Sequence, residues 1–175
     1  MIIMVNGAFG AGKTTVSEEL LRRIDGSMLY DPEFVGFLLR EIVPDDAKSA
    51  DEQTGDFQDL RPWKSLVVKV AEEIKNTYGK HLIVPMTIRK REYFEEIVNG
   101  FKRIDPKTYH FCLMASKETI HNRLRSRGEE DGNWCFQQTD ACLDAFEDSI
   151  FEQKIWTEDK TVNEIAEEIM RKVDQ

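Results

Sequence analysis

The sequence predicts an α/β protein in which a five-stranded parallel sheet is covered by helices on both faces. Short apolar runs alternate with amphipathic segments along the chain, and this alternation favours parallel strands joined by right-handed crossovers. The clearest runs are MIIMVN at 1–6, HLIVPM at 81–86 and YHFCLMA at 109–115. A glycine-rich stretch follows the first run directly. Because such sheets bind ligands at the carboxyl ends of their strands, the functional site is expected there.

The stretch GAFGAGKT at 7–14 matches the phosphate-loop pattern G-x-x-x-x-G-K-[ST] at every position. A strand precedes it and an amphipathic helix at 15–24 follows it, which is the context that the pattern requires and which disfavours a purely structural turn. Glycines let successive N–H groups surround a phosphate, and the helix dipole adds positive potential. The predicted cofactors are ATP and Mg²⁺. The loop residues predicted to contact them are Gly7, Ala8, Phe9, Gly10, Ala11, Gly12, Lys13, Thr14 and Thr15.

Two of these residues have predicted roles in chemistry. Lys13 is expected to reach the β- and γ-phosphates and is a catalytic candidate, and the Thr14 hydroxyl is expected to bind the metal.

The other elements follow from capping and periodicity. Asp31 and Pro32 suit the N-cap and first position of a helix, Ser116 suits another N-cap, and Thr161 with Glu164 forms a capping box. Gly100 is predicted to end a helix. The predicted strands are 27–30 and 152–156, and the predicted helices are 32–41, 61–74, 91–100, 116–127, 135–147 and from 161 onward.

We expect one domain over residues 1–175. The acidic, glycine- and proline-containing stretch at 43–60 predicts a flexible surface loop, and GEEDGNW at 128–134 predicts a short lid.

Composition narrows the function classes. A net charge of −9 argues against a general nucleic-acid binder, which would need a basic surface. Three cysteines without a C-x-x-C pair fit a reducing compartment, so we expect a cytoplasmic protein without structural disulfides. The three histidines lack metal-ligand spacing, and no apolar run reaches the length of a membrane span. The predicted partners are a nucleotide and a small-molecule acceptor, and the oligomeric state stays open.

Four segments, MIIMVNGAFGAGKTT, YDPEFVGFLLREIVP, LIVPMTI and FCLMASKETIHNRLRSR, resemble the tunicamycin-resistance protein family. That family lies within the nucleoside-monophosphate-kinase-like and shikimate-kinase-like group of P-loop proteins. The resemblance implies a three-layer kinase-like fold with strand order 2-3-1-4-5, nucleotide binding, and a link to resistance against a nucleoside antibiotic.

The resemblance also implies roles for three residues. Arg123 and Arg127 match the R-L-x-x-R pattern of a lid helix, whose arginines contact base and phosphates, and Arg127 would stabilise the transferring phosphoryl group. A solvated basic helix face is the alternative. Asp31 matches the carboxylate that activates the acceptor hydroxyl and holds metal-bound water, and a pure helix-capping role is its alternative.

The sequence departs from many P-loop enzymes after LIVPMT, where Pro85, Met86 and Thr87 stand in place of a metal-shell Asp. The metal site is therefore in doubt, with Thr14 the first candidate ligand and Asp31 the second.

The acceptor side is less defined. Phe34, Phe37 and Leu38 have i, i+3, i+4 spacing, which is more typical of core packing than of a pocket. Several residues follow strand ends or begin helices, where a substrate would lie. The predicted substrate-binding residues are Asp31, Phe34, Arg40, Arg61, Trp63, Met86 and Thr87.

These observations favour an ATP- and Mg²⁺-dependent phosphotransferase acting on an alcohol group. One alternative is an ATP-binding protein that sequesters the antibiotic unmodified, and a weaker one is a nucleotide-dependent regulator. Trp134 and Trp156 are further candidates beside the lid and the adenine side.

Overall fold

The computed structural model describes residues 1–151 and 153–173. Its five strands are all parallel and lie in the order β2-β3-β1-β4-β5, which confirms the predicted fold class and strand order. Glu152, the first residue of the predicted last strand, lies outside the described residues. The strands are β1 (Ile2–Gly7), β2 (Ser27–Leu29), β3 (His81–Pro85), β4 (Thr108–Met114) and β5 (Lys154–Trp156).

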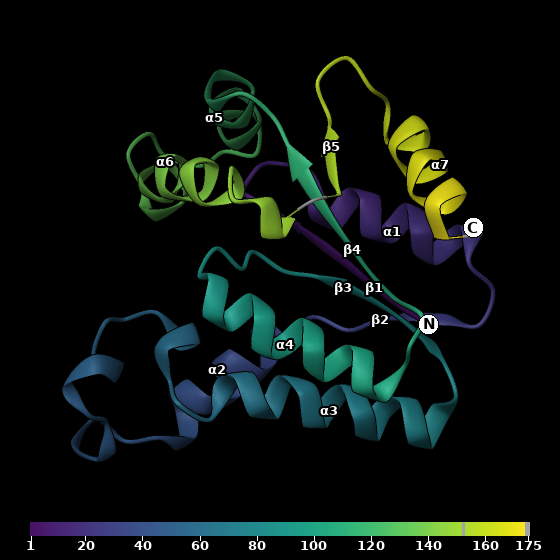
Figure 1. Cartoon of the computed structure of the whole chain (residues 1–175). Coiled ribbons are helices and arrows are strands. Elements are labelled where there is room, and N and C mark those ends of the chain that lie inside the picture. Colours follow the sequence, from purple (N-terminus) through teal and green to yellow (C-terminus); the bar gives the residue numbers. More distant parts are fainter. Residues whose placement is uncertain (152, 174–175) are drawn as a thin grey trace.

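Helices cover both faces of the sheet (Figure 1). α1 (Lys13–Arg23) and α7 (Val162–Val173) pack on one face, where Ile3 and Val5 of β1 belong to their hydrophobic cluster. Ile2 and Met4 point to the other face. Because β1 is buried on both faces, its run of apolar residues does not alternate with polar ones. The helices contributing to this second cluster are α2 (Glu33–Ile42), α3 (Trp63–Tyr78), α4 (Arg91–Ile104), α5 (Lys117–Ser126) and α6 (Trp134–Phe146).

Two predicted helix starts are confirmed in atomic detail. The Ser116 hydroxyl accepts a hydrogen bond from the Thr119 backbone N–H at 3.2 Å. At α7 the Thr161 hydroxyl accepts from the Glu164 N–H at 3.3 Å, and the Glu164 carboxylate accepts from the Thr161 N–H at 2.7 Å. Both partners of the capping box are therefore satisfied.

The predicted end of a helix at Gly100 is wrong, because α4 continues to Ile104. Gly100 is buried, and a Cβ there would lie 2.4 Å from the Val68 Cγ2 atom. The glycine therefore allows α3 and α4 to approach closely, a contact that local sequence does not reveal.

The stretch 43–60 contains three 3-10 turns, Asp45–Ala47, Ala50–Glu52 and Phe57–Asp59. Figure 1 shows this stretch in blue beyond the ends of α2 and α3. Within residues 1–151 and 153–173, no helix has the length and apolarity needed to cross a membrane.

Candidate functional site

Residues 7–14 form a cradle of backbone between β1 and α1. Gly7 lies close to β4, since a Cβ there would be 2.8 Å from the Leu113 carbonyl oxygen. Gly12 precedes α1 with φ +102°, and a Cβ there would meet nothing within 4 Å. The loop is thus packed against the sheet on one side and open at the helix start. An open helix N-terminus flanked by glycines has the geometry that binds a phosphate group.

Lys13 bends back over this cradle. Its Nζ atom donates to the Ala8 carbonyl oxygen at 2.9 Å and lies 5.2 Å from the centroid of the Phe9 ring. Burial lowers the pKa of Lys13 to about 8, although the Glu33 carboxylate opposes that effect. A lysine held against the loop in this way can donate to phosphate oxygens there.

Two carboxylates, Asp31 and Glu33, stand at the start of α2, where the charge of Lys13 acts on both. Asp31 accepts a hydrogen bond from the Glu33 backbone N–H at 2.9 Å. It therefore caps the turn that opens α2, although the N-cap position falls on Pro32 rather than on Asp31. Burial raises the pKa of Asp31 and of Glu33, and Lys13 acts in the opposite direction on both. Sequence reasoning missed Glu33, which the spacing Asp31-x-Glu33 after a strand end could have indicated.

The ends of β1 and β3 are joined by buried polar side chains. Asn6 Oδ1 accepts from the N–H groups of Gly7 and Ile88 at 2.9 Å each, and Asn6 Nδ2 donates to the Ile88 carbonyl oxygen at 2.9 Å. Thr87 Oγ1 donates to the Gly7 carbonyl oxygen at 2.8 Å. The segment after β3 therefore orients the phosphate loop through hydrogen bonds, and it contributes no carboxylate at Met86 or Thr87.

A pocket of about 380 Å³ lies beside the cradle. It joins the phosphate loop to α2, to the stretch 43–60 and to the start of α6. The Phe9 ring packs edge-on against Trp134, with centroids 4.9 Å apart. The lining residues are Phe9, Glu33, Phe37, Arg40, Gly55, Asp56, Phe57, Gln58 and Trp134.

Phe34, a predicted substrate residue, shares its helical spacing with Phe37 and Leu38. Phe34, Phe37 and Leu38 are 70%, 44% and 56% exposed, so core packing is the wrong interpretation of their spacing. Only Phe37 of the three lines this pocket. The core-facing residues of α2 are instead Val35, Gly36 and Leu39.

Three more predicted substrate residues contact the protein itself. Arg61 is exposed and pairs with Asp51 at 3.1 Å. Trp63 is fully buried, where its Nε1 donates to the Pro32 carbonyl oxygen at 3.3 Å, and Met86 is 1% exposed. Direct substrate contact by Trp63 or Met86 is therefore incompatible with this structure, whereas Arg40 lines the pocket and Thr87 adjoins it.

A family model described as an AAA domain matches residues 2–151. The chain belongs to this AAA-domain family. A comparison with curated proteins finds no match.

Among solved structures, this AAA-domain chain is similar to the Deinococcus radiodurans tunicamycin resistance protein. The TM-score is 0.79 with 28% sequence identity, over 98% of this chain and 94% of that one. The predicted resemblance is thereby confirmed. The fold is shared with a gluconokinase from Sinorhizobium meliloti (TM-score 0.66, 18% identity, 98% and 90% covered). It is also shared with shikimate kinase from Acinetobacter baumannii (TM-score 0.61, 14% identity, 98% and 92% covered).

The two predicted lid arginines of this AAA-domain chain differ in their contacts. Arg123 Nη1 donates to the Thr157 hydroxyl at 2.9 Å and to the Ala11 carbonyl oxygen at 3.4 Å, so Arg123 ties the phosphate loop to the segment after β5. Burial lowers the pKa of Arg123, and Glu158 opposes that effect. Arg127 is exposed at the end of α5, close enough to Lys13 to lower the pKa of that lysine.

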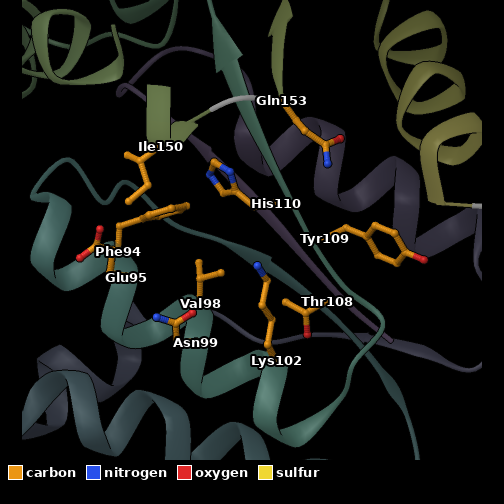
Figure 2. Close-up of a pocket in the computed structure, with 10 residues that line it drawn as sticks. All are labelled: Phe94, Glu95, Val98, Asn99, Lys102, Thr108, Tyr109, His110, Ile150 and Gln153. Carbon is orange, nitrogen blue, oxygen red and sulfur yellow. The ribbon is translucent and has the colours of Figure 1, made fainter. Parts of the chain in front are cut away.

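A separate cavity of about 280 Å³ lies between α4 and the first residues of β4 (Figure 2). Figure 2 shows His110 of β4 above Phe94 of α4, with Lys102 extending toward the space between the two elements. Because Gly7 pairs with Leu113 at the other end of β4, this cavity is remote from the phosphate loop.

Proposed function

We propose that this protein is an ATP-dependent phosphotransferase that acts on a hydroxyl group of a small molecule and is linked to tunicamycin resistance. The observation that carries the proposal is that Glu33 lines the same pocket as Phe9 of the phosphate loop, whose ring centroid lies 5.2 Å from the Lys13 Nζ atom. The charge of Lys13 also opposes the rise in the pKa of Asp31 and Glu33. The adjoining pocket is large enough for a small acceptor.

Each residue has a defined part in this reaction. The loop amides and Lys13 hold the β- and γ-phosphates, while Asp31 accepts the proton of the acceptor hydroxyl. The acceptor oxygen forms a bond to the γ-phosphorus as the bond from that phosphorus to the β,γ-bridging oxygen breaks, and ADP leaves. Burial raises the carboxyl pKa values, which suits proton acceptance near neutral pH.

The residues present fit a nucleotide and one metal ion. Gly12 leaves open space at the start of α1, where phosphates bind in this type of loop. When bound, Mg²⁺ neutralises charge on the phosphate oxygens. Thr14 would bind the ion directly, and Asp31 would hold one of its water ligands, since Mg²⁺ takes few protein ligands in nucleotide sites. Arg127 would add positive charge above the transferring group.

The alternative is sequestration of the antibiotic without chemical change. The segment after β3 favours it, because Met86 and Thr87 stand where many P-loop enzymes have a metal-shell carboxylate.

A mass spectrum distinguishes the two functions. Purified protein is incubated with Mg-ATP in separate reactions, each of which contains one candidate acceptor. The candidates are tunicamycin, gluconate, shikimate and a nucleotide sugar. A gain of one phosphoryl group that is lost in Lys13→Met identifies a kinase and its acceptor. If tunicamycin binds and returns unchanged, sequestration is the function, and a phosphorylated product that persists in Lys13→Met contradicts the assigned site.

A further inference from the structure

Residues 54–60, here called the strap, form one wall of the pocket beside the phosphate loop. Gly55, Asp56, Phe57 and Gln58 all line that pocket. The strap carries no part of the phosphate-loop pattern, and both its own 3-10 turn and contacts with distant segments hold it in place.

One set of contacts connects the strap to the phosphate loop. Gln58 Nε2 donates to the Thr87 carbonyl oxygen at 2.8 Å, and the Thr87 hydroxyl in turn donates to the Gly7 carbonyl oxygen at 2.8 Å. Two hydrogen bonds therefore link the pocket wall to the first glycine of the loop.

A second set of contacts converges on Asp59. Its Oδ1 atom accepts hydrogen bonds from the Lys90 ammonium and from the Tyr93 hydroxyl, the latter at 2.7 Å. Its Oδ2 atom accepts from the Thr54 hydroxyl at 2.8 Å. The Asp59 side chain is only 9% exposed, so these donors take the place of water around its charge.

The electrostatics agree with this geometry. Burial alone would raise the pKa of Asp59, yet the hydrogen bonds from Lys90, Tyr93 and Thr54 hold it below its usual value. The same contacts raise the pKa of Lys90 against the effect of its own burial. The ionised pair is therefore the stable form at neutral pH.

The strap also packs against the backbone of α2. A Cβ at Gly36 would lie 2.2 Å from the Phe57 Cδ2 atom, so the Phe57 ring occupies the space that a side chain at position 36 would need. The Phe57 ring centroid lies 5.7 Å from the Phe37 ring centroid and 5.1 Å from the Arg40 Cζ atom.

We propose that Asp59 is a positioning residue for the acceptor. Through Lys90 and Tyr93 it fixes the strap to the start of α4, and through Thr54 it joins the two ends of the strap. Asp56, Phe57 and Gln58 then present a preformed wall to the bound molecule. This inference rests on the proposed function, since it assigns the pocket to the acceptor. Preformed walls improve binding because less conformational entropy is lost when the ligand arrives.

Hydrogen exchange on the full chain without ligand tests directly whether Asp59 holds the strap in place. Asp59→Asn removes the charge, and Tyr93→Phe removes one donor with little change in shape, which provides a second variant if the first fails to fold. Asp45→Asn is the matched control, since it breaks an exposed ion pair with Lys48 in the same stretch. We expect exchange of the 54–60 amides to increase about tenfold or more in Asp59→Asn, less in Tyr93→Phe, and not in the control.

Kinetics on an acceptor identified by mass spectrometry test the consequence. We expect Asp59→Asn to raise the acceptor KM about tenfold while the dissociation constant for ATP stays unchanged, with Asp59→Glu restoring part of the loss. Unchanged exchange in both variants would show that Asp59 does not hold the strap. Faster exchange with an unchanged acceptor KM would overturn the positioning role. If no compound in the panel reacts or binds, the proposed function itself fails, and the exchange result alone decides whether Asp59 holds the strap.

Discussion

The phosphate loop at residues 7–14 is one continuous segment, whereas the pocket beside it takes its walls from four separate parts of the chain. Its own glycines and the helix that follows directly give the loop its shape, and hydrogen bonds from Thr87 and Arg123 orient it. The pocket depends on contacts such as that of Asp59 with Lys90, which join residues far apart in sequence. The residues that form the loop are therefore recognisable within one short segment of sequence, whereas the residues that form the pocket are brought together only by the fold.

Substitutions of the carboxylates Asp31 and Glu33 give the largest expected effect on activity. Asp31→Asn keeps an oxygen able to accept from the Glu33 N–H, so the helix start is retained while the base is lost. We expect kcat to fall by about 100-fold or more, with little change in the free energy of unfolding. Glu33→Gln is the matched variant, for which we expect a smaller loss. Steady-state kinetics decide the assignment, because a larger loss in Glu33→Gln would make Glu33 the base.

The titration of Lys13, in the phosphate loop, should make both stability and ATP affinity depend on pH. Its folded pKa of about 8 lies below the 10.5 of an unfolded lysine, so the unfolded chain binds more protons between these values. Stability without nucleotide should therefore rise as pH increases from 8 to 10.5. Nucleotide phosphates favour the charged form, and the affinity for ATP should fall by up to about tenfold per pH unit above 8.

Calorimetry in buffers of different ionisation enthalpy measures the proton uptake that this dependence requires. Lys13→Arg keeps a charged group throughout the range, so its ATP affinity should be nearly independent of pH between 7 and 10. An equal slope in Lys13→Arg and the natural chain would assign the titration to another group.

Alanine substitutions at two buried glycines, Gly36 and Gly100, distinguish the effect of packing beside the pocket from that of packing elsewhere. A Cβ at Gly36 would lie 2.2 Å from Phe57, and one at Gly100 would lie 2.4 Å from Val68. Either change to alanine should lower the free energy of unfolding by about 1–3 kcal/mol through overpacking, measured by urea denaturation. Only Gly36→Ala should also raise the acceptor KM, by several-fold, because only Phe57 lines the pocket. A similar KM change in Gly100→Ala would indicate a global effect.

Features formed by consecutive residues could be predicted from the sequence, whereas features formed by distant residues could not. The phosphate loop, the Ser116 cap and the Thr161 capping box each lie within a few consecutive residues, and their geometry agrees with prediction. The strand order came from family resemblance rather than from spacing. The predicted helix end at Gly100 is wrong because the residue that requires a glycine there, Val68, lies on another helix.

The residues on the acceptor side show what local sequence patterns cannot predict. Helical spacing identifies a shared face at Phe34, Phe37 and Leu38, but it does not say whether that face meets the core or solvent. Trp63 was assigned to substrate from its position before a helix, although its ring is buried against α2. The family resemblance implies one acceptor-activating carboxylate, Asp31, and it does not point to Glu33 two residues later.

His110 gives the smallest expected effect and lies apart from both regions. Its Nε2 atom is buried without a hydrogen-bond partner among the described residues, and its ring packs against Phe94 with centroids 4.5 Å apart. Burial lowers the pKa of His110 to about 3, below the 6.5 of an unfolded histidine. The unfolded chain therefore binds the proton first, and stability should decrease as pH falls from 6.5 toward 3.

Between pH 7 and pH 5 this single residue should cost about 1–2 kcal/mol of unfolding free energy. Urea denaturation at the two pH values should show that His110→Phe removes this part of the acid sensitivity. Lys102→Met is the control, because burial rather than the Lys102 charge is the main cause of the lowered pKa, so most of the dependence should remain. Equal acid sensitivity in His110→Phe and the natural chain would mean that the imidazole reaches water in the folded protein. Because this site is remote from the phosphate loop, ATP affinity at pH 7 should be the same in all three proteins.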